Sequence, residues 1–527
     1  MTHQVLVGGR WRDAKDPVGA FTANDPAQGV PIPGEYPISS WLDLAEALAA
    51  GAGAAPALAQ AGPDRIAGCL DALAAGLERR ADALIDMARL ETGLPAASRL
   101  RSSELPRTTG QLRQAAAACR DRSWTRATID TKLDIRSKLG PIGGPVAVMG
   151  PSNFPFAFNA VGGGDFVAAL AAANPVIAKA NPQSPGTTRI MAEAAFEALS
   201  ASGLPAAAVQ LVYHFSPEDA RKLVSHPLIG ASAFTGGRAA GLGLKEAADR
   251  AGKPIYLEMS SINPVFVLAG ALKERGRDIA AELFASCTLG AGQFCTKPGL
   301  VIYQEGPGDG GLSEAIEAAF NGAPADIVLG RGVVRGLEAG VERLKKLGAE
   351  LTAGRGEAEG PGFRFRPALF RVPAARFLKS PAEFQVESFG AVSLAVAAKD
   401  VGEMTAVAAA LEGQLTATVF SARDGSDDAA YAVLEPLLRR RCGRLLNDKV
   451  PTGVAVSPAM NHGGPFPATG HPGFTSVGIP AAMTRFAALH CYDNVRQDRL
   501  PFELRNENPT GRMWRLVDGE WTQRSIG

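Results

Sequence analysis

The chain has 527 residues, which is too long for one hydrophobic core, so we expect two or three domains. Apolar residues make up 46% of the chain and charged residues 20%, a balance typical of a globular protein and not of a disordered one. The formal net charge is +1 and the charges are interspersed. This excludes the basic patch that would indicate nucleic acid or an anionic membrane surface as a partner.

The start of the chain, MTHQVLVGGRWRDA, lacks a charged region followed by an apolar run, so we expect no signal peptide. Apolar windows such as residues 166–180 are too short to span a bilayer and contain Asn174-Pro175. The six cysteines form no CxxC pair and the six histidines form no HxxxH pattern. We therefore expect a cytoplasmic protein with neither a disulfide framework nor a bound metal.

The first 139 residues predict a strand, then helices, then an exposed strand. VLVGGRW at residues 5–11 has the pattern of a strand and turn, and residues 40–120 predict successive Ala- and Leu-rich helices. Residues 124–139 alternate apolar and polar side chains, as an exposed strand does. A half-polar strand outside a core is often completed by another chain, so this segment is a candidate oligomerisation arm.

From Gly140 onward, short apolar strands alternate with helices, which predicts a parallel, doubly wound sheet. The expected strands are residues 146–149, 175–179, 209–213 and 231–234, and the expected helices are 165–173, 186–200 and 217–225. Ligands of such sheets bind beyond the carboxyl ends of the strands. PSNFPF follows the first strand, KANP the second and FTGGRAAG the fourth, so these segments are candidate ligand contacts.

No GxGxxG fingerprint follows any of these strands. Instead, FTGGRAAG places Gly236, Gly237, Arg238 and Gly241 where a strand runs into a helix. Free backbone N–H groups at that helix start could hold a pyrophosphate. An ordinary strand–turn–helix connection explains the same pattern equally well.

A second α/β unit is expected from Glu258 to about residue 446, with strands at 265–268 and 300–303 and a helix at 276–288. The segment from Pro451 is rich in Pro, Gly and His, which predicts a loop that packs over another part of the molecule. Residues 483–492 again have the pattern of a strand that could pair with another subunit.

Cys295 lies in FASCTLGAGQFCTKPGL, between a flexible Gly-Ala-Gly run and a Pro-Gly pair that stops a helix. A cysteine thiolate is a strong nucleophile, although most free cysteines are small buried hydrophobes. No histidine lies nearby in sequence to activate it. On this fragment alone, the buried-hydrophobe interpretation is favoured.

Five motifs in order change that balance: Asn153 in SNFP, Lys179 in KANP, Glu258 in YLEMSSINP, Cys295 in GQFCTKPG and Glu387 in ESFG. With them, the chain resembles the aldehyde dehydrogenase superfamily over nearly its full length. EMSSINPVF and HGGPFPAT resemble the branch that contains 2,5-dioxovalerate (α-ketoglutaric semialdehyde) dehydrogenases and long-chain aldehyde dehydrogenases.

The resemblance implies a role for each of three residues. Cys295 attacks the aldehyde carbon, the Asn153 amide and the Cys295 N–H stabilise the oxyanion, and Glu258 activates the water that hydrolyses the thioester. A nicotinamide accepts the hydride, because no side chain can. Glu258 follows an apolar strand, so we expect partial burial to raise its pKa toward neutrality. Without the resemblance, Asn153 could be a turn residue and Glu258 an ordinary strand-end carboxylate.

The resemblance also implies a cofactor site. Lys179 and Glu387 would hold the two riboses, with Phe389 beside them. NAD-preferring relatives carry Glu where this chain has Pro182, so repulsion of a 2′-phosphate is absent and NADP becomes acceptable alongside NAD. Arg238 could pair with a phosphate or be a solvated helix charge. Gly237, usually Ser in the family, leaves the pyrophosphate contacts open.

Aromatic side chains are expected around the aldehyde tunnel, namely Phe156, Phe294, Phe389 and Phe466, although core packing is an equally good explanation. A dicarboxylic semialdehyde needs a cationic group for its distal carboxylate. His462, His471 and Arg485 are candidates, and the sequence gives none of them a defined position.

The sequence therefore predicts an α/β, aldehyde dehydrogenase-like fold with two doubly wound domains and a β-strand oligomerisation arm. We expect a dinucleotide-binding domain at 1–122 and 140–257, a catalytic domain at 258–455, an arm at 123–139 and 483–499, an active-site loop region at 456–482 and a tail at 500–527. The predicted function is NAD(P)-dependent oxidation of an aldehyde, 2,5-dioxovalerate first, by a homodimer or homotetramer. The alternatives are a long-chain or broad-specificity enzyme, a thioester hydrolase, and a catalytically silent binding protein.

Overall fold

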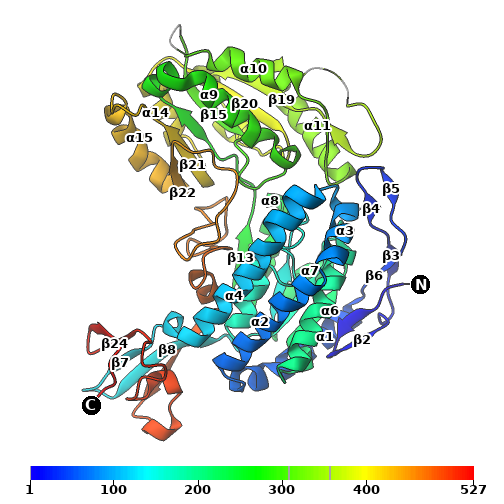
Figure 1. Ribbon diagram of the computed structural model, residues 1–527, viewed down its shortest axis with the longest axis vertical. Helices are drawn as coiled ribbons and strands as arrows, with labels where there is room; N and C mark the ends of the chain where they lie inside the picture. Colours follow the sequence, from blue (N-terminus) through cyan, green and yellow to red (C-terminus); the bar gives the residue numbers. More distant parts are fainter. Residues whose placement is uncertain (1, 307–308, 355, 357) are drawn as a thin grey trace.

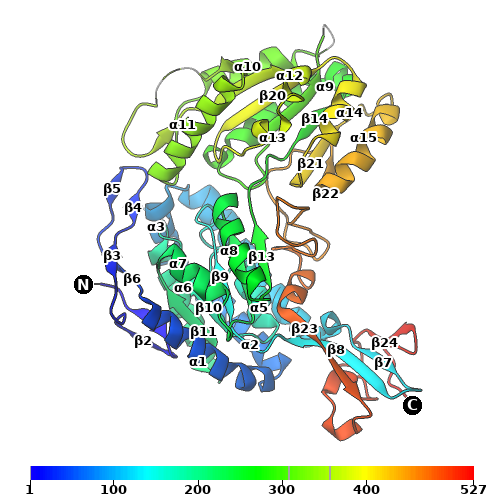
Figure 2. The same cartoon turned by 180° about the vertical axis from the view of Figure 1, so that it is seen from behind.

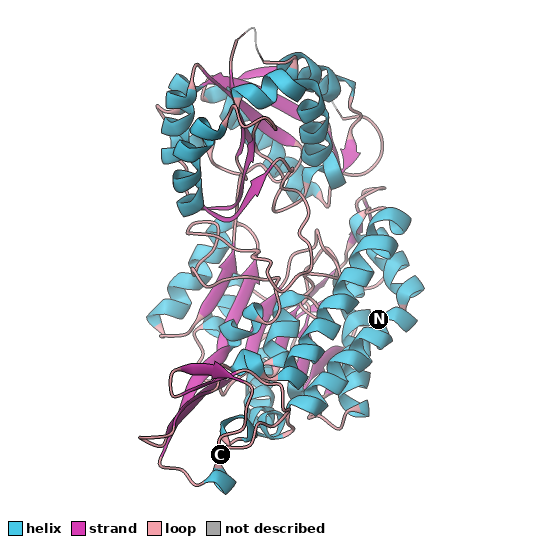
Figure 3. Cartoon of the chain, turned by 60° about the vertical axis from the view of Figure 1, so that its left-hand side comes forward, coloured by secondary structure: helices cyan, strands magenta, loops and turns pink. Residues whose placement is uncertain are grey.

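Two α/β lobes lie one above the other, and a β-sheet arm extends from the lower one (Figures 1 and 2). The computed structural model describes residues 2–306, 309–354, 356 and 358–527. Each lobe is organised on a seven-stranded sheet covered by helices, as Figure 3 shows by element type. The predicted fold class is therefore confirmed.

The lower lobe contains a sheet with strand order β13-β12-β9-β10-β11-β1-β2. Its first five strands are parallel, and β1 and β2 join the edge antiparallel. The strands are β1 (Val5–Val7), β2 (Arg10–Arg12), β9 (Val146–Met149), β10 (Val176–Lys179), β11 (Val209–Val212), β12 (Ala231–Thr235) and β13 (Ile255–Glu258). The chain forms β9, β10 and β11 in one direction and then returns to form β12 and β13 on the other side of β9. The topological switch point, where ligands of such sheets bind, therefore lies between β9 and β12.

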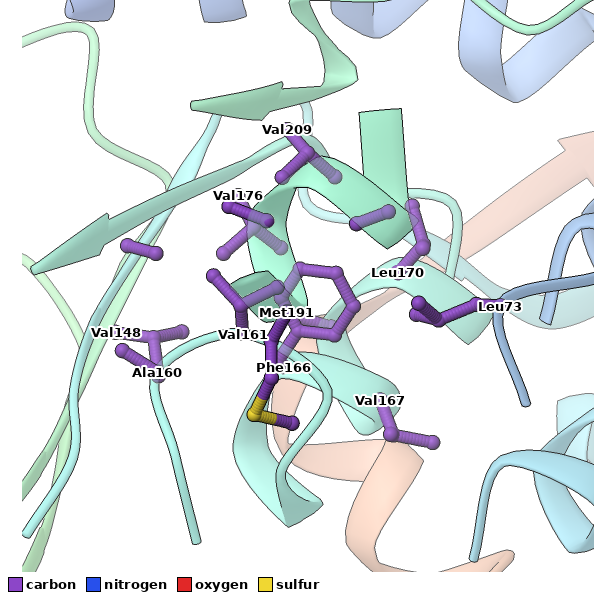
Figure 4. Close-up of a cluster of buried hydrophobic side chains, with 14 of the residues drawn as sticks. Leu73, Val148, Ala160, Val161, Phe166, Val167, Leu170, Val176, Met191 and Val209 are labelled. Atoms are coloured by element: carbon purple, nitrogen blue, oxygen red, sulfur yellow. The ribbon is translucent and has the colours of Figure 1, made fainter. Parts of the chain in front are cut away.

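Helices cover this sheet because its strands are apolar on both faces. The helices are α1 (Trp41–Gln60), α2 (Pro63–Arg79), α3 (Ala81–Thr92), α4 (Leu105–Asp121), α5 (Gly164–Ala171), α6 (Pro185–Ala201), α7 (Pro217–Val224) and α8 (Arg238–Arg250). Figure 4 shows how Phe166 of α5 lies among Val148, Val176 and Val209 from three neighbouring strands. Leu73 of α2 and Met191 of α6 belong to the same buried cluster, so strands and helices share one core.

The upper lobe contains the second sheet, with order β17-β19-β20-β15-β14-β21-β22, parallel except for β17. Its strands are β14 (Val265–Val267), β15 (Leu300–Gln304), β17 (Glu350–Ala353), β19 (Ala368–Pro373), β20 (Val392–Ala398), β21 (Gln414–Phe420) and β22 (Cys442–Asn447). Its helices are α9 (Ala269–Thr288), α10 (Leu312–Gly322), α11 (Arg331–Lys346), α12 (Ala374–Phe377), α13 (Pro381–Phe384), α14 (Val401–Ala409) and α15 (Asp428–Arg441). A kink at Arg275 divides α9, and the predicted helix 276–288 is the part after the kink.

The arm is a five-stranded sheet with order β23-β8-β7-β24-β25. Its strands are β7 (Thr128–Asp130), β8 (Ile135–Pro141), β23 (Ala487–Asp493), β24 (Arg515–Val517) and β25 (Glu520–Thr522). Residues 124–139, expected as one exposed strand, form a hairpin instead, because Asp130 accepts hydrogen bonds from the backbone of residues 132 and 133 and closes a turn.

The C-terminal segment also differs from the expectation. Residues 500–527 are not a separate tail, because they supply two strands of the arm and bury Leu500, Leu504 and Met513 against Ile129. The arm strand expected from residue 483 is β23, which begins at residue 487, since Met483 and Phe486 are buried in the core of the lower lobe. These short apolar contacts give the arm a small core of its own.

Three two-stranded sheets complete the strand inventory of the described residues. They pair β3 (Gly19–Phe21) with β6 (Tyr36–Ile38), β4 (Asn24–Asp25) with β5 (Val30–Pro31), and β16 (Asp326–Ile327) with β18 (Arg364–Phe365).

Among the described helices, α1 alone has the length and apolar composition to cross a membrane, and the core helix of a globular protein can have the same length and composition. Leu44, Leu48 and Leu58 of α1 are buried in the core of the lower lobe. The window at 166–180 contains most of α5 and all of β10.

Candidate active site

A tight turn between α9 and β15 of the upper lobe positions Cys295. After α9, the backbone has positive φ at Gly290, Ala291 and Gly292. A Cβ at Gly292 would lie 2.4 Å from the Ala391 nitrogen, so only glycine fits there. The turn reverses the chain before Cys295, and Asn263 fixes the next residues by donating to the Cys295 and Lys297 carbonyls.

Cys295, Glu258 and His462 meet at one point, although they are far apart in sequence. The Sγ atom of Cys295 lies 3.3 Å from Nε2 of His462. The same nitrogen lies 2.9 Å from Oε1 of Glu258. Ser476 donates to the other carboxylate oxygen of Glu258 at 3.1 Å. A thiol, an imidazole and a carboxylate in contact are a set able to move protons at a nucleophile.

Glu258 lies at the end of β13, with its side chain 2% exposed. Burial alone would raise its pKa, but His462 beside it, followed by the hydrogen bonds from His462 and Ser476, holds the pKa below its ordinary value. The expected rise toward neutrality is therefore wrong. The sequence showed the apolar strand that buries the carboxyl group, but not the imidazole that stabilises its anion.

The thiol of Cys295 has the opposite shift. Burial, followed by the negative charge of Glu258, raises the pKa of Cys295 well above its ordinary value, and the positive charge of Arg107 opposes the rise. The resting side chain is consequently a thiol and not a thiolate. It needs a proton acceptor, and Nε2 of His462 is in contact with it.

His462 is the residue whose role the sequence did not indicate. It lies in the long connection between β22 and β23, where Thr475 accepts a hydrogen bond from its backbone N–H and its carbonyl accepts one from Ser476. Its ring is 2% exposed. The motif HGGPFPAT contains it, but 167 residues separate it from Cys295, and no sequence pattern states that the two meet.

The three ligand atoms of this group all lie within 4.8 Å of one another, a spacing that could also hold a metal ion. The hydrogen-bond distances already pair the atoms directly. The expectation that no metal takes part stays a prediction.

Asn153 follows β9 at the same cavity as Cys295 and Glu258, which has a volume of about 540 Å³. The side chain is 8% exposed and donates one amide hydrogen to the Gln293 carbonyl at 2.9 Å. An amide NH₂ group has two hydrogens. This hydrogen bond to Gln293, two residues before Cys295, fixes the orientation of the Asn153 amide. The second hydrogen of that amide is available for a ligand.

Glu387, Phe389, Gly236 and Gly237 line this cavity too. Burial raises the pKa of Glu387 to about 7, and Lys297 opposes that rise. The cavity thus extends from the nucleophile to the switch point of the lower sheet, across both lobes.

A second cavity, of about 390 Å³, lies beyond Gly236 and is lined by Lys179, Asn181, His214 and Arg221. None of its lining residues is acidic. Burial lowers the pKa of Lys179 to about 8. Helix α8 begins here after Gly237 with no side-chain cap, so its first N–H groups can donate hydrogen bonds to a phosphate. A dinucleotide fits this arrangement: a cavity at the switch point, an uncapped helix start and a cation for a ribose hydroxyl.

The remaining predicted cofactor residues are less directly placed. Arg238 forms an ion pair with Glu412 at 2.9 Å, so its charge is already matched. Gly241 lines neither cavity and packs against Met259, where a Cβ would lie 3.0 Å from the sulfur. The assignment of Arg238 and Gly241 to the cofactor stays a prediction. Pro182 lies between Asn181 and Gln183, which line the first cavity, but is not itself in the lining.

The aromatic side chains near Cys295 are partly different from those expected. Phe294 is 6% exposed and packs edge-on against Phe154, with ring centroids 5.1 Å apart. Phe158 packs against Phe154 and against the ring of His462. Phe154 and Phe158 were missed. Phe156 was assigned to the tunnel wrongly, because it is fully buried in the core of the lower lobe. Phe466 is 63% exposed, outside the cluster of Phe154, Phe158 and Phe294.

Comparison with known proteins agrees with this geometry. The model of the aldehyde dehydrogenase family matches residues 11–463. The chain is 39% identical to alpha-ketoglutaric semialdehyde dehydrogenase 2 of Azospirillum brasilense over 531 residues, covering 99% of both chains. It is 38% identical to alpha-ketoglutaric semialdehyde dehydrogenase of Acinetobacter baylyi, covering 86% of both. An aldehyde dehydrogenase of Pseudomonas syringae, solved with NAD⁺ and octanal, superposes with a TM-score of 0.78 at 19% identity, covering 93% of this chain and 96% of that one.

Proposed function

The chain belongs to the aldehyde dehydrogenase family, and we propose that it oxidises α-ketoglutaric semialdehyde to 2-oxoglutarate. Membership of this family makes it an oxidoreductase that acts on aldehydes with a nicotinamide cofactor. The observation that carries the mechanism is the contact of Cys295 with His462, and of His462 with Glu258. The two α-ketoglutaric semialdehyde dehydrogenases among its relatives support the choice of substrate.

In the proposed first step, the Cys295 thiol transfers its proton to Nε2 of His462. The new N–H then faces the Glu258 carboxylate at 2.9 Å, whose low pKa keeps it ionised and able to stabilise the imidazolium. Both partners contact the same ring nitrogen, which has one in-plane position for a proton, so Nε2 accepts the thiol proton when the neutral ring carries its own proton on Nδ1. The thiolate attacks the aldehyde carbon, and the free hydrogen of the Asn153 amide with the Cys295 N–H stabilises the oxyanion.

A bound nicotinamide would accept the hydride from the thiohemiacetal. His462 first releases the thiol proton to solvent; the resulting thioester is then hydrolysed by a water whose proton goes to His462, which returns it to the departing Cys295 thiolate. Because Glu258 has a lowered pKa, it is a weak base by itself, and we assign the proton transfer to His462 with Glu258 as its orienting partner. This revises the simpler role of Glu258 as the only base.

We also propose NADP as the preferred cofactor. The second cavity contains Lys179, His214 and Arg221 and no acidic lining residue, which favours the extra phosphate of NADP. Lys179 and Glu387 are proposed to hold the two riboses, since each lines one of the two cavities.

Steady-state kinetics with NADP test this function. Wild type is expected to form NADPH with α-ketoglutaric semialdehyde, and Cys295→Ala to form none. Cys491→Ala is the matched control, because Cys491 is an exposed cysteine on the arm. A much higher kcat/KM for decanal would identify a long-chain enzyme. Full activity of Cys295→Ala would refute the mechanism. Cofactor-independent thioester cleavage without any aldehyde oxidation would indicate a hydrolase, and no reaction at all a silent binding protein.

The arm is proposed to build a homodimer or homotetramer. β23 is an edge strand of its sheet, and its Leu489 is 69% exposed. An unpaired apolar edge is available for another chain. Light scattering of wild type and of Leu489→Lys gives the masses, and a wild-type monomer would refute the proposal.

A further inference from the structure

Two arginines flank the aromatic cluster of Phe154, Phe158 and Phe294. The Arg99 guanidinium lies 4.2 Å from the Phe154 ring centroid and 4.8 Å from that of Phe294. The Arg107 guanidinium lies 5.7 Å from the Phe154 centroid and 5.3 Å from that of Phe158. Since Phe158 packs on the ring of His462, Arg107 stands one aromatic ring away from the proposed proton relay.

The two arginines differ in how their charge is matched. Arg99 forms an ion pair with the buried Glu104 at 3.3 Å and donates to the Asn153 carbonyl. Arg107 donates through Nη1 to the Val454 carbonyl at 2.7 Å. Its Nε and Nη2 are buried, and among the described residues neither has a hydrogen-bond partner. The described part of the chain also places no carboxylate within ion-pair distance of Arg107.

An unmatched buried guanidinium is costly, because a buried charge needs a partner to repay its lost hydration. Two neighbouring N–H groups on one edge of the plane, Nε and Nη2, have the geometry of a fork that binds a carboxylate through both oxygens. Burial lowers the pKa of Arg107, and Glu104, followed by Cys295, opposes that effect, while Arg107 in turn lowers the pKa of Cys295. Arg107 is thus within electrostatic reach of the reacting sulfur.

The other cations near the site already have partners. Arg485 forms a buried ion pair with Asp165 at 2.8 Å, which matches its charge although neither of its Nη atoms has a hydrogen-bond partner among the described residues, and His462 belongs to the proton relay. His471 is exposed and packs against Tyr256. Arg444 donates to the Pro451 and Gly453 carbonyls, which holds the loop carrying Val454.

We propose that Arg107 binds the distal carboxylate of the substrate through its unpaired Nε and Nη2, while Phe158 and Phe294 enclose the carbon chain between that carboxylate and Cys295. The inference rests on the proposed function for its substrate class, an aldehyde with a carboxylate at the other end. Arg107 is a specificity residue here, and the charge it supplies distinguishes a semialdehyde from an uncharged aldehyde of the same length.

The experiment compares Arg107→Met with wild type on α-ketoglutaric semialdehyde and on pentanal, an uncharged five-carbon aldehyde. The variant is expected to lose about 10- to 150-fold in kcat/KM with the semialdehyde, the range for one hydrogen bond to a charged group, and to change less than about threefold with pentanal. Arg107→Lys keeps the charge without the fork and is expected to lie between the two. Arg113→Met is the matched control, an exposed arginine on the same helix paired with Glu78.

Equal losses on both aldehydes would overturn the proposal, because Arg107 would then act on the thiol or on the fold. No loss on the semialdehyde would overturn it as well. Calorimetric binding of 2-oxoglutarate to the full-length protein separates this inference from the proposed function. If wild type fails to oxidise the semialdehyde yet binds 2-oxoglutarate at least tenfold more tightly than Arg107→Met, the function is wrong and the site stands. Equal affinities, or no binding to either protein, would refute the site.

Discussion

Replacing His462 by Asn tests the proton relay directly. Asn is close in shape to His but cannot accept the thiol proton, and Cys295 has a raised pKa that makes this transfer necessary. General acid–base catalysis contributes about 10²- to 10⁴-fold, so we expect kcat/KM for the semialdehyde to fall by that factor, equivalent to about 2.7–5.5 kcal/mol of transition-state stabilisation.

The same substitution should change the pH dependence. His462 is the main influence that lowers the pKa of Glu258 against the effect of burial. Without it, burial prevails and the pKa of Glu258 rises above its ordinary value. The carboxylate is needed in its ionised form, which exists above its pKa. The acidic limb of the kcat/KM profile should therefore shift to higher pH in His462→Asn.

The assay is a pH series of NADPH formation, with single-turnover measurements to separate chemistry from cofactor release. His471→Asn is the matched control, since His471 is an exposed histidine of the same connection. A His462→Asn enzyme with the wild-type rate and an unshifted acidic limb would refute the relay.

Two other substitutions have definite expected outcomes. Pro182→Glu brings a carboxylate beside the cavity of Lys179, so charge repulsion should lower kcat/KM with NADP at least about tenfold relative to NAD. The neutral variant Pro182→Gln should not show this loss. Equal effects of the two substitutions would contradict the assignment of the 2′-phosphate position. Gly292→Ala places a Cβ 2.4 Å from the Ala391 nitrogen at a φ of 72°, so thermal unfolding should show a loss of about 1–3 kcal/mol in stability and activity assays a loss of turnover. The control Gly322→Ala, with no atom within 4 Å of its new Cβ, should leave stability and turnover unchanged. A Gly292→Ala enzyme with unaltered stability and turnover would contradict the role of the turn.

Local patterns in the sequence were sufficient for the overall fold. Strand–helix alternation from residue 140 predicted a parallel sheet because both the period of the apolar side chains and the length of the segments are local properties. The expected strands at 146–149 and 175–179 lie within about one residue of β9 and β10. The aldehyde dehydrogenase family, expected from motifs around Cys295 and Glu258, is confirmed by the comparisons.

The arm was only partly predictable. The alternation at 124–139 indicated strand correctly, but the hairpin depends on a turn closed by Asp130 and on residues 500–527, which pair with β7 from the far end of the chain. Pairing between segments so distant in sequence leaves no local periodicity to detect.

The site shows the same division between local and tertiary information. The sequence by itself indicated Cys295 as the proposed nucleophile, Glu258 as the proposed carboxylate beside it, and the strand end on which Glu258 lies. Only the tertiary structure decided that His462 from the far loop reaches both, which reverses the expected pKa shift of Glu258. Only it showed that Phe154 and Phe158, not Phe156, face the site, and that Arg107 keeps an unpaired edge beside them. The reason is physical: pKa values and pairing depend on what lies within a few ångströms in space, and folding brings those neighbours together from segments hundreds of residues apart.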